Sequence, residues 1–179
     1  MTTYLIIDVE TTSLEPSENG RITCISTYNF DDNKTISFWG ADEIKILLDF
    51  WNYIEILKCP TLVTFNGSSF DIFYLIHRSI VRSQKISKYS HLDLRHIVNS
   101  FFTTYDKRAK GGLSYWAAVL GIQQKTPPGC QMISLFMDKK YDEIKDHCCE
   151  DILITKALFE RLKFCGLIAG NGNNQNGKH

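Results

Sequence analysis

The stretch TYLIIDVE, residues 3–10, restricts the fold more than any other part of the sequence. A continuous apolar run of this kind is typical of a strand covered on both faces, as in the middle of an α/β sheet. Two acids, Asp8 and Glu10, stand at its end, and they point the same way because alternate side chains of a strand share a face. Adjacent carboxylates in such a position repel each other and lose solvation unless a positive group lies between them. A divalent cation would satisfy both acids; the alternative is that Glu10 lies in solvent beyond the strand.

Three consecutive strands are expected at the start of the chain. After residues 3–10, the segments RITCISTYNF (21–30) and KTISFWG (34–40) are rich in β-branched and aromatic residues, with the turn DDNK between them. Strands and helices then alternate, and the expected elements are a strand at 61–66, a helix at 70–83, a short strand running into a helix over 89–101, and a helix at 111–122. This alternation predicts a parallel sheet with an antiparallel front end.

Two long amphipathic helices are also expected. The first covers residues 41–58, where Asp42 is placed to cap it and Pro60 to close it. By helical spacing, its core-facing residues are Ile44, Leu47, Leu48, Trp51, Ile54 and Leu57. The second runs from about Lys139 to about Phe164, after a loop at KTPPG (125–129).

A chain of 179 residues is long enough to bury a core within one domain. Hydrophobic residues make up 44% and charged residues 22%, which are ordinary globular values. We expect one domain over residues 1–167 and a disordered tail over 168–179, since GNGNNQNGKH has no apolar content. No apolar run approaches the roughly 20 residues of a membrane span, and the N-terminus lacks a signal-peptide pattern. These features predict a soluble, intracellular protein that does not bind membranes.

The charge balance argues against a protein that coats nucleic acid by charge alone. There are 20 basic and 20 acidic residues, so the formal net charge is zero. An enzyme that grips one end of a strand is still compatible with this balance. Basic residues gather between Arg78 and Arg95 and again over 107–110, and a solvated loop face is the ordinary explanation of each cluster. The six scattered cysteines predict reduced thiols rather than a zinc or disulfide framework.

Two further acids stand at unusual places. Asp71 follows a short expected strand and the turn NGSS, at the start of an apolar helix, where capping of that helix is the ordinary explanation. Asp151 lies on the last helix, on the same stripe as the apolar residues Ile144 and Leu158. A carboxylate rarely belongs on an apolar stripe without a partner. His147 precedes Asp151 by one turn, so the imidazole and the carboxylate project in the same direction.

Together, three segments of the chain resemble the motifs of the DEDD family of 3′-to-5′ exonucleases. DVETTSLEP is similar to the first motif, NGSSFD to the second and HCCED to the third, in the order that the family has them. The resemblance implies an α/β, ribonuclease H-like fold with a central mixed five-stranded sheet and helices on both faces. The surroundings of the second and third motifs are most similar to the DNA polymerase B-like proofreading group.

By this resemblance Asp8, Glu10, Asp71 and Asp151 would hold two divalent cations, Mg²⁺ or Mn²⁺. In the two-metal mechanism one cation generates the attacking hydroxide and the other stabilises the leaving 3′ oxygen, which releases a nucleoside 5′-monophosphate. His147 would be the general base or would orient the attacking water, since an unperturbed imidazole titrates near neutral pH. The chain departs from the family here, because His147 precedes Asp151 by the spacing that the family's Tyr branch uses.

The resemblance also suggests which residues meet the terminal nucleotide. Asn66 and Phe70 would lie close to it, with a turn former and a core ring as the competing explanations. A second set would hold the 3′ end through backbone amides and an apolar wedge: Thr11, Thr12 and Leu14. Ser13 stands where the family usually has Gly. Asp93 ends another expected strand, and it either lines the site or caps a helix.

The leading hypothesis is therefore a metal-dependent 3′-to-5′ exonuclease that acts on single-stranded 3′ ends. Stacking of a base on Phe70 would bind the strand whatever its sequence, and the cations would neutralise the charge of the phosphate. The choice between DNA and RNA stays open, because no residue identifies a contact to the 2′-hydroxyl. The alternative is a non-catalytic ribonuclease H-like module that binds nucleic acid or a protein, and a structure-specific endonuclease is a third option.

Overall fold

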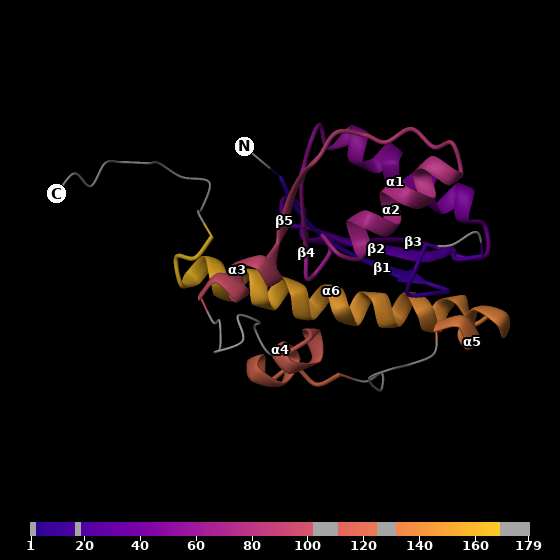
Figure 1. Ribbon diagram of the computed structural model, residues 1–179. Helices are drawn as coiled ribbons and strands as arrows, with labels where there is room; N and C mark the ends of the chain where they lie inside the picture. Colours follow the sequence, from indigo (N-terminus) through magenta and orange to yellow (C-terminus); the bar gives the residue numbers. More distant parts are fainter. Residues whose placement is uncertain (1–2, 17–18, 102–110, 125–131, 169–179) are drawn as a thin grey trace.

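A five-stranded sheet forms the centre of the computed structural model, which describes residues 3–16, 19–101, 111–124 and 132–168 (Figure 1). The strands lie in the order β3-β2-β1-β4-β5 and are β1 (Tyr4–Thr11), β2 (Ile22–Asn29), β3 (Lys34–Trp39), β4 (Thr61–Thr64) and β5 (Ser90–Asp93). β1, β2 and β3 pair antiparallel, whereas β4 pairs parallel to both β1 and β5. The predicted parallel sheet with an antiparallel front end is confirmed.

Helices cover both faces of this sheet, as predicted. They are α1 (Glu43–Ile56), α2 (Asp71–Val81), α3 (Leu94–Phe101), α4 (Leu113–Leu120), α5 (Met132–Met137) and α6 (Tyr141–Phe164). Figure 1 shows α1 and α2 on one face and the long α6 along the other, with α4 on the outer side of α6 and α5 beside the N-terminal end of α6. The short α5 was not expected from the sequence. The expected loop at 125–129 lies outside the described residues.

The side chains of β1 divide between two hydrophobic cores. Leu5, Ile7 and Val9 belong to the core under α1 and α2, whereas Ile6 belongs to the core under α6. Because side chains alternate along a strand, Asp8 and Glu10 share the face of Ile6 and point toward α6. The long helix therefore packs against the same face that carries the two acids.

The buried side of α1 differs from the expected one. Ile44 and Leu48 are about half exposed, at 49% and 48%. Ile46 and Phe50 are buried in their place, next to the expected Leu47. Apolar residues cover more of this helix than the sheet can bury, so spacing alone placed the core side too far toward one flank. Asp42 caps the helix as predicted, since its side chain accepts a hydrogen bond from the backbone N–H of Lys45.

The last described residues belong to the packed part of the chain. Ile168 is only 7% exposed and lies in the core under α6 with Leu162. Packing therefore reaches one residue beyond the expected end of the domain at residue 167, and residues 169–179 lie outside the described part. None of the helices that the structure describes has the length and apolar character needed to cross a bilayer.

A buried ion cluster ties α1 to α2. Both carboxylate oxygens of Glu43 are bonded to Arg78, and Oε2 also accepts a hydrogen bond from Arg82 at 2.7 Å. Arg78 is completely buried, so the interpretation of this basic segment as a solvated face was wrong for that residue. Burial opposes ionisation of Glu43, but the hydrogen bonds from the two guanidinium groups outweigh it and lower the pKa of the carboxyl.

Replacing Glu43 by Gln is expected to destabilise the protein at pH 7 by about 3–5 kcal/mol, since it leaves a buried guanidinium without its counter-charge. The pKa of Glu43 is lower in the folded than in the unfolded chain. Its contribution is therefore fully present above the unfolded pKa and is lost as the pH falls through the folded one. Urea unfolding at pH 7 and at pH 3 measures both effects, and the difference between variant and wild type should shrink at pH 3.

The matched control is Glu55→Gln. Glu55 pairs with Lys85 at 3.1 Å, but both side chains are exposed, at 58% and 78%. Exposed ion pairs contribute little, so this change should alter the free energy of unfolding by less than about 1 kcal/mol. Equal losses in the two variants would contradict the assignment of the Glu43 cluster as a buried, structural ion group.

Candidate active site

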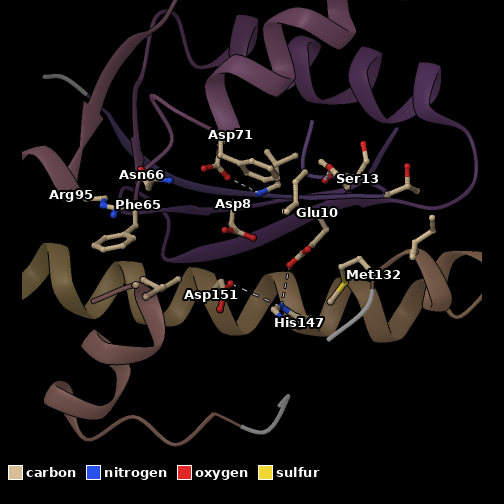
Figure 2. Close-up of a pocket in the computed structure, with 18 residues that line it drawn as sticks. Asp8, Glu10, Ser13, Phe65, Asn66, Asp71, Arg95, Met132, His147 and Asp151 are labelled. Atoms are coloured by element: carbon tan, nitrogen blue, oxygen red, sulfur yellow. Dashed lines mark hydrogen bonds and ion pairs between the residues drawn. The ribbon is translucent and has the colours of Figure 1, made fainter. Parts of the chain in front are cut away.

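The predicted site residues lie around one cavity of about 530 Å³, shown in Figure 2. It opens beside the end of β1, between α2 and α6. The lining includes every residue proposed for catalysis or substrate binding, namely Asp8, Glu10, Thr11, Thr12, Leu14, Asn66, Phe70, Asp71, His147 and Asp151. These side chains come from three segments that are far apart in the sequence, and the tertiary structure brings them together.

Asp71 reaches the site because β4 is short. The parallel pairing of β4 with β1 ends at Ile6, opposite Val63, so the last part of β1 has no strand on that side. There the backbone N–H of Val9 donates a hydrogen bond to Oδ1 of Asp71, at 3.0 Å. The expected capping role of Asp71 is therefore replaced by a bond to the strand, and the N-cap position of α2 is Phe70. The carboxylate of Asp71 lies against the backbone between Asp8 and Glu10.

Two residues of α6 complete the group from the opposite side. Nδ1 of His147 lies 3.0 Å from Oε1 of Glu10 and 4.0 Å from Oδ2 of Asp151. The imidazole and the carboxylate thus project in the same direction, as the helical spacing predicted. The contact with Glu10 is an ion pair by distance, and Nδ1 is buried without a well-aligned hydrogen bond. His147 therefore bridges the acids of β1 and the acid of α6.

The carboxylates of the site oppose one another electrostatically. Burial, followed by the charges of Asp151, Asp71 and Glu10, raises the pKa of Asp8 well above its ordinary value. Burial also raises the pKa of Asp71 to about 7 and that of Asp151 to about 6. These shifts mean that the folded protein disfavours negative charge on each of these acids. A cation placed between them would remove that penalty.

His147 differs from the unperturbed imidazole that the sequence suggested. Its contact with the Glu10 carboxylate, acting against burial, raises its pKa to about 9. In the protein alone, the imidazole therefore carries a proton at neutral pH and supplies part of the positive charge that the acids require. The role of this residue depends on its contact with Glu10, which the spacing of the motifs did not predict.

A buried thiol holds Asp8 in place. Sγ of Cys148 lies 3.2 Å from Oδ2 of Asp8 and donates a hydrogen bond to it. Cys148 is the residue after His147 on α6, and it is completely buried. The helix therefore positions the first acid of the site as well as the last one. From the sequence alone, Cys148 was expected only to be a reduced thiol.

The donor set fits divalent cations. Glu10, His147 and Asp151 each offer a ligand atom, and these atoms lie within 4.8 Å of one another. Asp8 and Asp71 add two more carboxylates to the same cavity wall. A set rich in carboxylate oxygens, with one imidazole, suits Mg²⁺ or Mn²⁺ better than a soft metal. The mutual repulsion of the acids is the observation that favours a cation here over an ordinary polar pocket.

The loop after β1 forms one rim of the cavity. The register between β1 and β2 shifts between Glu10 and Thr11, at the end of the strand. The hydroxyl of Thr11 donates to the carbonyl of Ser13, and Leu14 is 86% exposed. Ser13, which departs from the family's usual Gly, lies with its hydroxyl 2.9 Å from the hydroxyl of Tyr74. The hydroxyl of Ser13 therefore links this rim to Tyr74 of α2, while Leu14 stays exposed at the edge of the cavity.

The opposite rim is held by Asp93. Its carboxylate accepts hydrogen bonds from the backbone N–H groups of Asn66, Ser68 and Arg95, at 2.8, 2.9 and 3.0 Å. Burial disfavours its charge, yet the bonds from Ser68 and Asn66 outweigh this and lower the pKa of Asp93. Asp93 thus caps α3 and fixes the preceding loop, but it is not among the residues that line the cavity. Asn66, at φ 69°, confirms the turn former, and it lines the cavity as well.

Several lining residues were not found from the sequence. They are Phe65 after β4, Arg95 at the start of α3, Leu113 at the start of α4, and Met132 and Ile133 on α5. Arg95 had a usable signal, because it follows the end of a parallel strand as Asn66 does. The residues of α4 and α5 had none, since only the packing of these helices on α6 brings them to the cavity.

The fold and the site together define an α/β protein of the ribonuclease H-like class, with acids on the first strand and on the last long helix. A solved structure has the same fold. The family B DNA polymerase of the hyperthermophilic archaeon Pyrobaculum calidifontis superposes with a TM-score of 0.73 over 91% of this chain, at 16% sequence identity. The match spans only 25% of the polymerase chain.

The chain belongs to the RNase_H superfamily, whose family model matches residues 5–163. A curated relative is the uncharacterized protein MJ0365 of Methanocaldococcus jannaschii, which is 31% identical over 176 residues. That alignment covers 91% of this chain and 97% of the relative. The predicted ribonuclease H-like fold is confirmed, and the superfamily match and the likeness to a family B polymerase support the resemblance to the ribonuclease H-like 3′-to-5′ exonuclease group.

Replacing Asp8 by Asn is expected to stabilise the protein in EDTA and to reduce its stabilisation by Mn²⁺. The folded state raises the pKa of Asp8, so above its unfolded pKa the ionised acid favours unfolding, and Asn removes that effect. The amide oxygen of Asn can still accept the hydrogen bond that the thiol of Cys148 donates to Asp8. In thermal unfolding at pH 7, we expect Tm in EDTA to rise by about 2–4 °C for each kcal/mol gained.

Asp146→Asn is the control, since Asp146 lies on the same helix but is 74% exposed. It should leave Tm in EDTA and the Mn²⁺ shift close to those of the wild type. A lower Tm for Asp8→Asn in EDTA, or an undiminished shift with Mn²⁺, would count against a cation site built on mutually repelling acids.

Proposed function

We propose that this protein is a metal-dependent 3′-to-5′ exonuclease that releases nucleoside 5′-monophosphates from single-stranded DNA or RNA. The observation that carries the proposal is the convergence of Asp8, Glu10, Asp71 and Asp151 with His147 on the wall of one cavity. Membership of the RNase_H superfamily supports a nuclease reaction. The 3′-to-5′ direction rests on the resemblance of the three motifs to the DEDD exonucleases.

The four carboxylates would hold two divalent cations, Mg²⁺ or Mn²⁺, which supply an activated water and charge stabilisation to phosphodiester hydrolysis when bound. Asp71 is kept in position by the backbone of Val9, and Asp8 by the thiol of Cys148. His147 lies between Glu10 and Asp151, where it is placed to orient an attacking water or to accept its proton.

The rims of the cavity suit the end of a strand. Leu14 projects from one rim as an exposed apolar side chain, and Phe70 lines the cavity from the start of α2. Thr11 and Thr12 line the cavity beside Leu14, with the Thr11 hydroxyl donating to the carbonyl of Ser13 and the Thr12 N–H donating to the carbonyl of Arg21. Asn66 lines the opposite rim. The volume of about 530 Å³ falls in the range of small-ligand sites, which suits a single terminal nucleotide.

The proposal predicts that pure protein shortens 5′-labelled single-stranded DNA or RNA from the 3′ end in Mg²⁺ or Mn²⁺, and that EDTA abolishes the reaction. Asp8→Ala should remove activity, because it deletes one of the four carboxylates proposed to hold the cations. His147→Ala should lower kcat by about 10²–10⁴-fold, the usual range for a general acid–base group. Denaturing gels of the labelled products measure all three.

Asp146→Asn again serves as the control and should give the wild-type ladder. Internal fragments without a 3′ ladder would identify an endonuclease instead. Strands that stay intact with both metals, while still binding to the protein, would favour the non-catalytic module. A comparison of the rates on DNA and RNA of the same sequence then identifies the preferred nucleic acid.

A further inference from the structure

Arg95 brings a cation to a cavity that is otherwise acidic. Among the described residues that line the cavity, it is the only Lys or Arg, beside four carboxylates and one imidazole. Figure 2 shows its guanidinium beside Phe65 and Asn66, on the other side of the carboxylates from Ser13 and Met132. Arg95 was not among the residues predicted to contact substrate.

The backbone of Arg95 is held by Asp93, apart from the four carboxylates that line the cavity. Arg95 is the second residue of α3, and its N–H donates to Oδ1 of Asp93 at 3.0 Å. The same carboxylate holds Asn66 and Ser68, so the start of α3 and the loop before α2 form one fixed rim. Among the described residues, no carboxylate forms an ion pair with the guanidinium of Arg95, although four line the same cavity.

A half-buried guanidinium without an acidic partner is suited to an external anion. Its planar fork matches a phosphate group with two parallel hydrogen bonds. The scissile phosphate would lie at the four acids, whereas Arg95 lies apart from them, beside Phe65. In a strand bound by its 3′ end, the terminal nucleoside is joined to the rest only through the scissile phosphate. Every other backbone phosphate therefore lies on the 5′ side.

We infer that Arg95 binds a backbone phosphate on the 5′ side of the scissile bond, with Phe65 beside it as an apolar surface for the attached nucleoside. This subsite rests on the proposed exonuclease function and deepens it. It gives the enzyme a contact that only a strand can make, since a mononucleotide ester has no second phosphate. Arg95 thereby favours strands over isolated nucleotides as substrates.

The test compares two substrates of the wild type and of Arg95→Gln. One is a single-stranded decanucleotide, and the other is thymidine 5′-(4-nitrophenyl phosphate), which has one phosphodiester, with 4-nitrophenol as the leaving group, and no further phosphate. The ratio of kcat/KM for the strand to kcat/KM for the ester should fall about tenfold to a hundredfold in Arg95→Gln, the effect of losing hydrogen bonds to a charged group. Arg95→Lys, which keeps the charge but not the fork, should restore part of the ratio.

Lys88→Gln is the control. Lys88 is exposed and lines a separate cavity, of about 360 Å³, between α1 and the segment before β5. It should show the wild-type ratio of strand to ester. An unchanged ratio in Arg95→Gln would overturn the inference. If both substrates keep their kcat/KM, Arg95 makes no contact that matters; if both lose it equally, Arg95 acts at the scissile phosphate or supports the fold.

Binding separates this inference from the proposed function. In an Asp8→Ala background, Arg95→Gln should weaken the binding of the labelled strand and lower the slope of log Kd against log salt by about 0.7, the value for one phosphate contact on a single strand. If the wild type hydrolyses neither substrate, the exonuclease proposal fails while this measurement still decides on Arg95. Unchanged binding and an unchanged slope would exclude the phosphate subsite.

Discussion

The early end of the pairing between β4 and β1 is the constraint on which the site depends. Because that ladder stops at Ile6, the N–H of Val9 has no strand partner, and the carboxylate of Asp71 takes its place. If β4 continued further along β1, its carbonyl groups would occupy this N–H, and Asp71 would be excluded from the strand that carries Asp8 and Glu10. A buried backbone donor needs an acceptor, so the gap in the sheet and the acid that fills it belong together.

The molecule treats its buried acids in two different ways. The chain itself stabilises the charges of Glu43 and Asp93. Glu43 accepts hydrogen bonds from two guanidinium groups, and Asp93 accepts them from three backbone N–H groups. Both have lowered pKa values, and both are structural. Asp8 and Asp71 have raised pKa values instead, first because they are buried and second because other carboxylates lie beside them. An acid cluster left in that condition is typical of a site completed by a ligand.

Sequence reasoning found the acids because they interrupt a pattern. Asp8 and Glu10 end an apolar strand, and Asp151 stands on an apolar stripe of α6, so each demands a partner. Phe65 and Arg95 interrupt nothing, since an aromatic residue after a strand and a basic residue at the start of a helix are common. Arg78 was misread for a related reason: its partner Glu43 lies on another helix, and no local pattern reports a contact between distant segments.

Apart from α5, the sequence by itself determined the order of the strands and helices along the chain, and it identified the acids that have no place in an apolar core, because periodicity and local composition are properties of neighbouring residues. The tertiary structure alone decided how these parts meet. It brought His147 to 3.0 Å from Glu10, placed the thiol of Cys148 on Asp8, and turned Arg95 toward the cavity beside Phe65. Distances between segments, and the pKa values that follow from them, depend on packing across the sheet, which no stretch of sequence encodes locally.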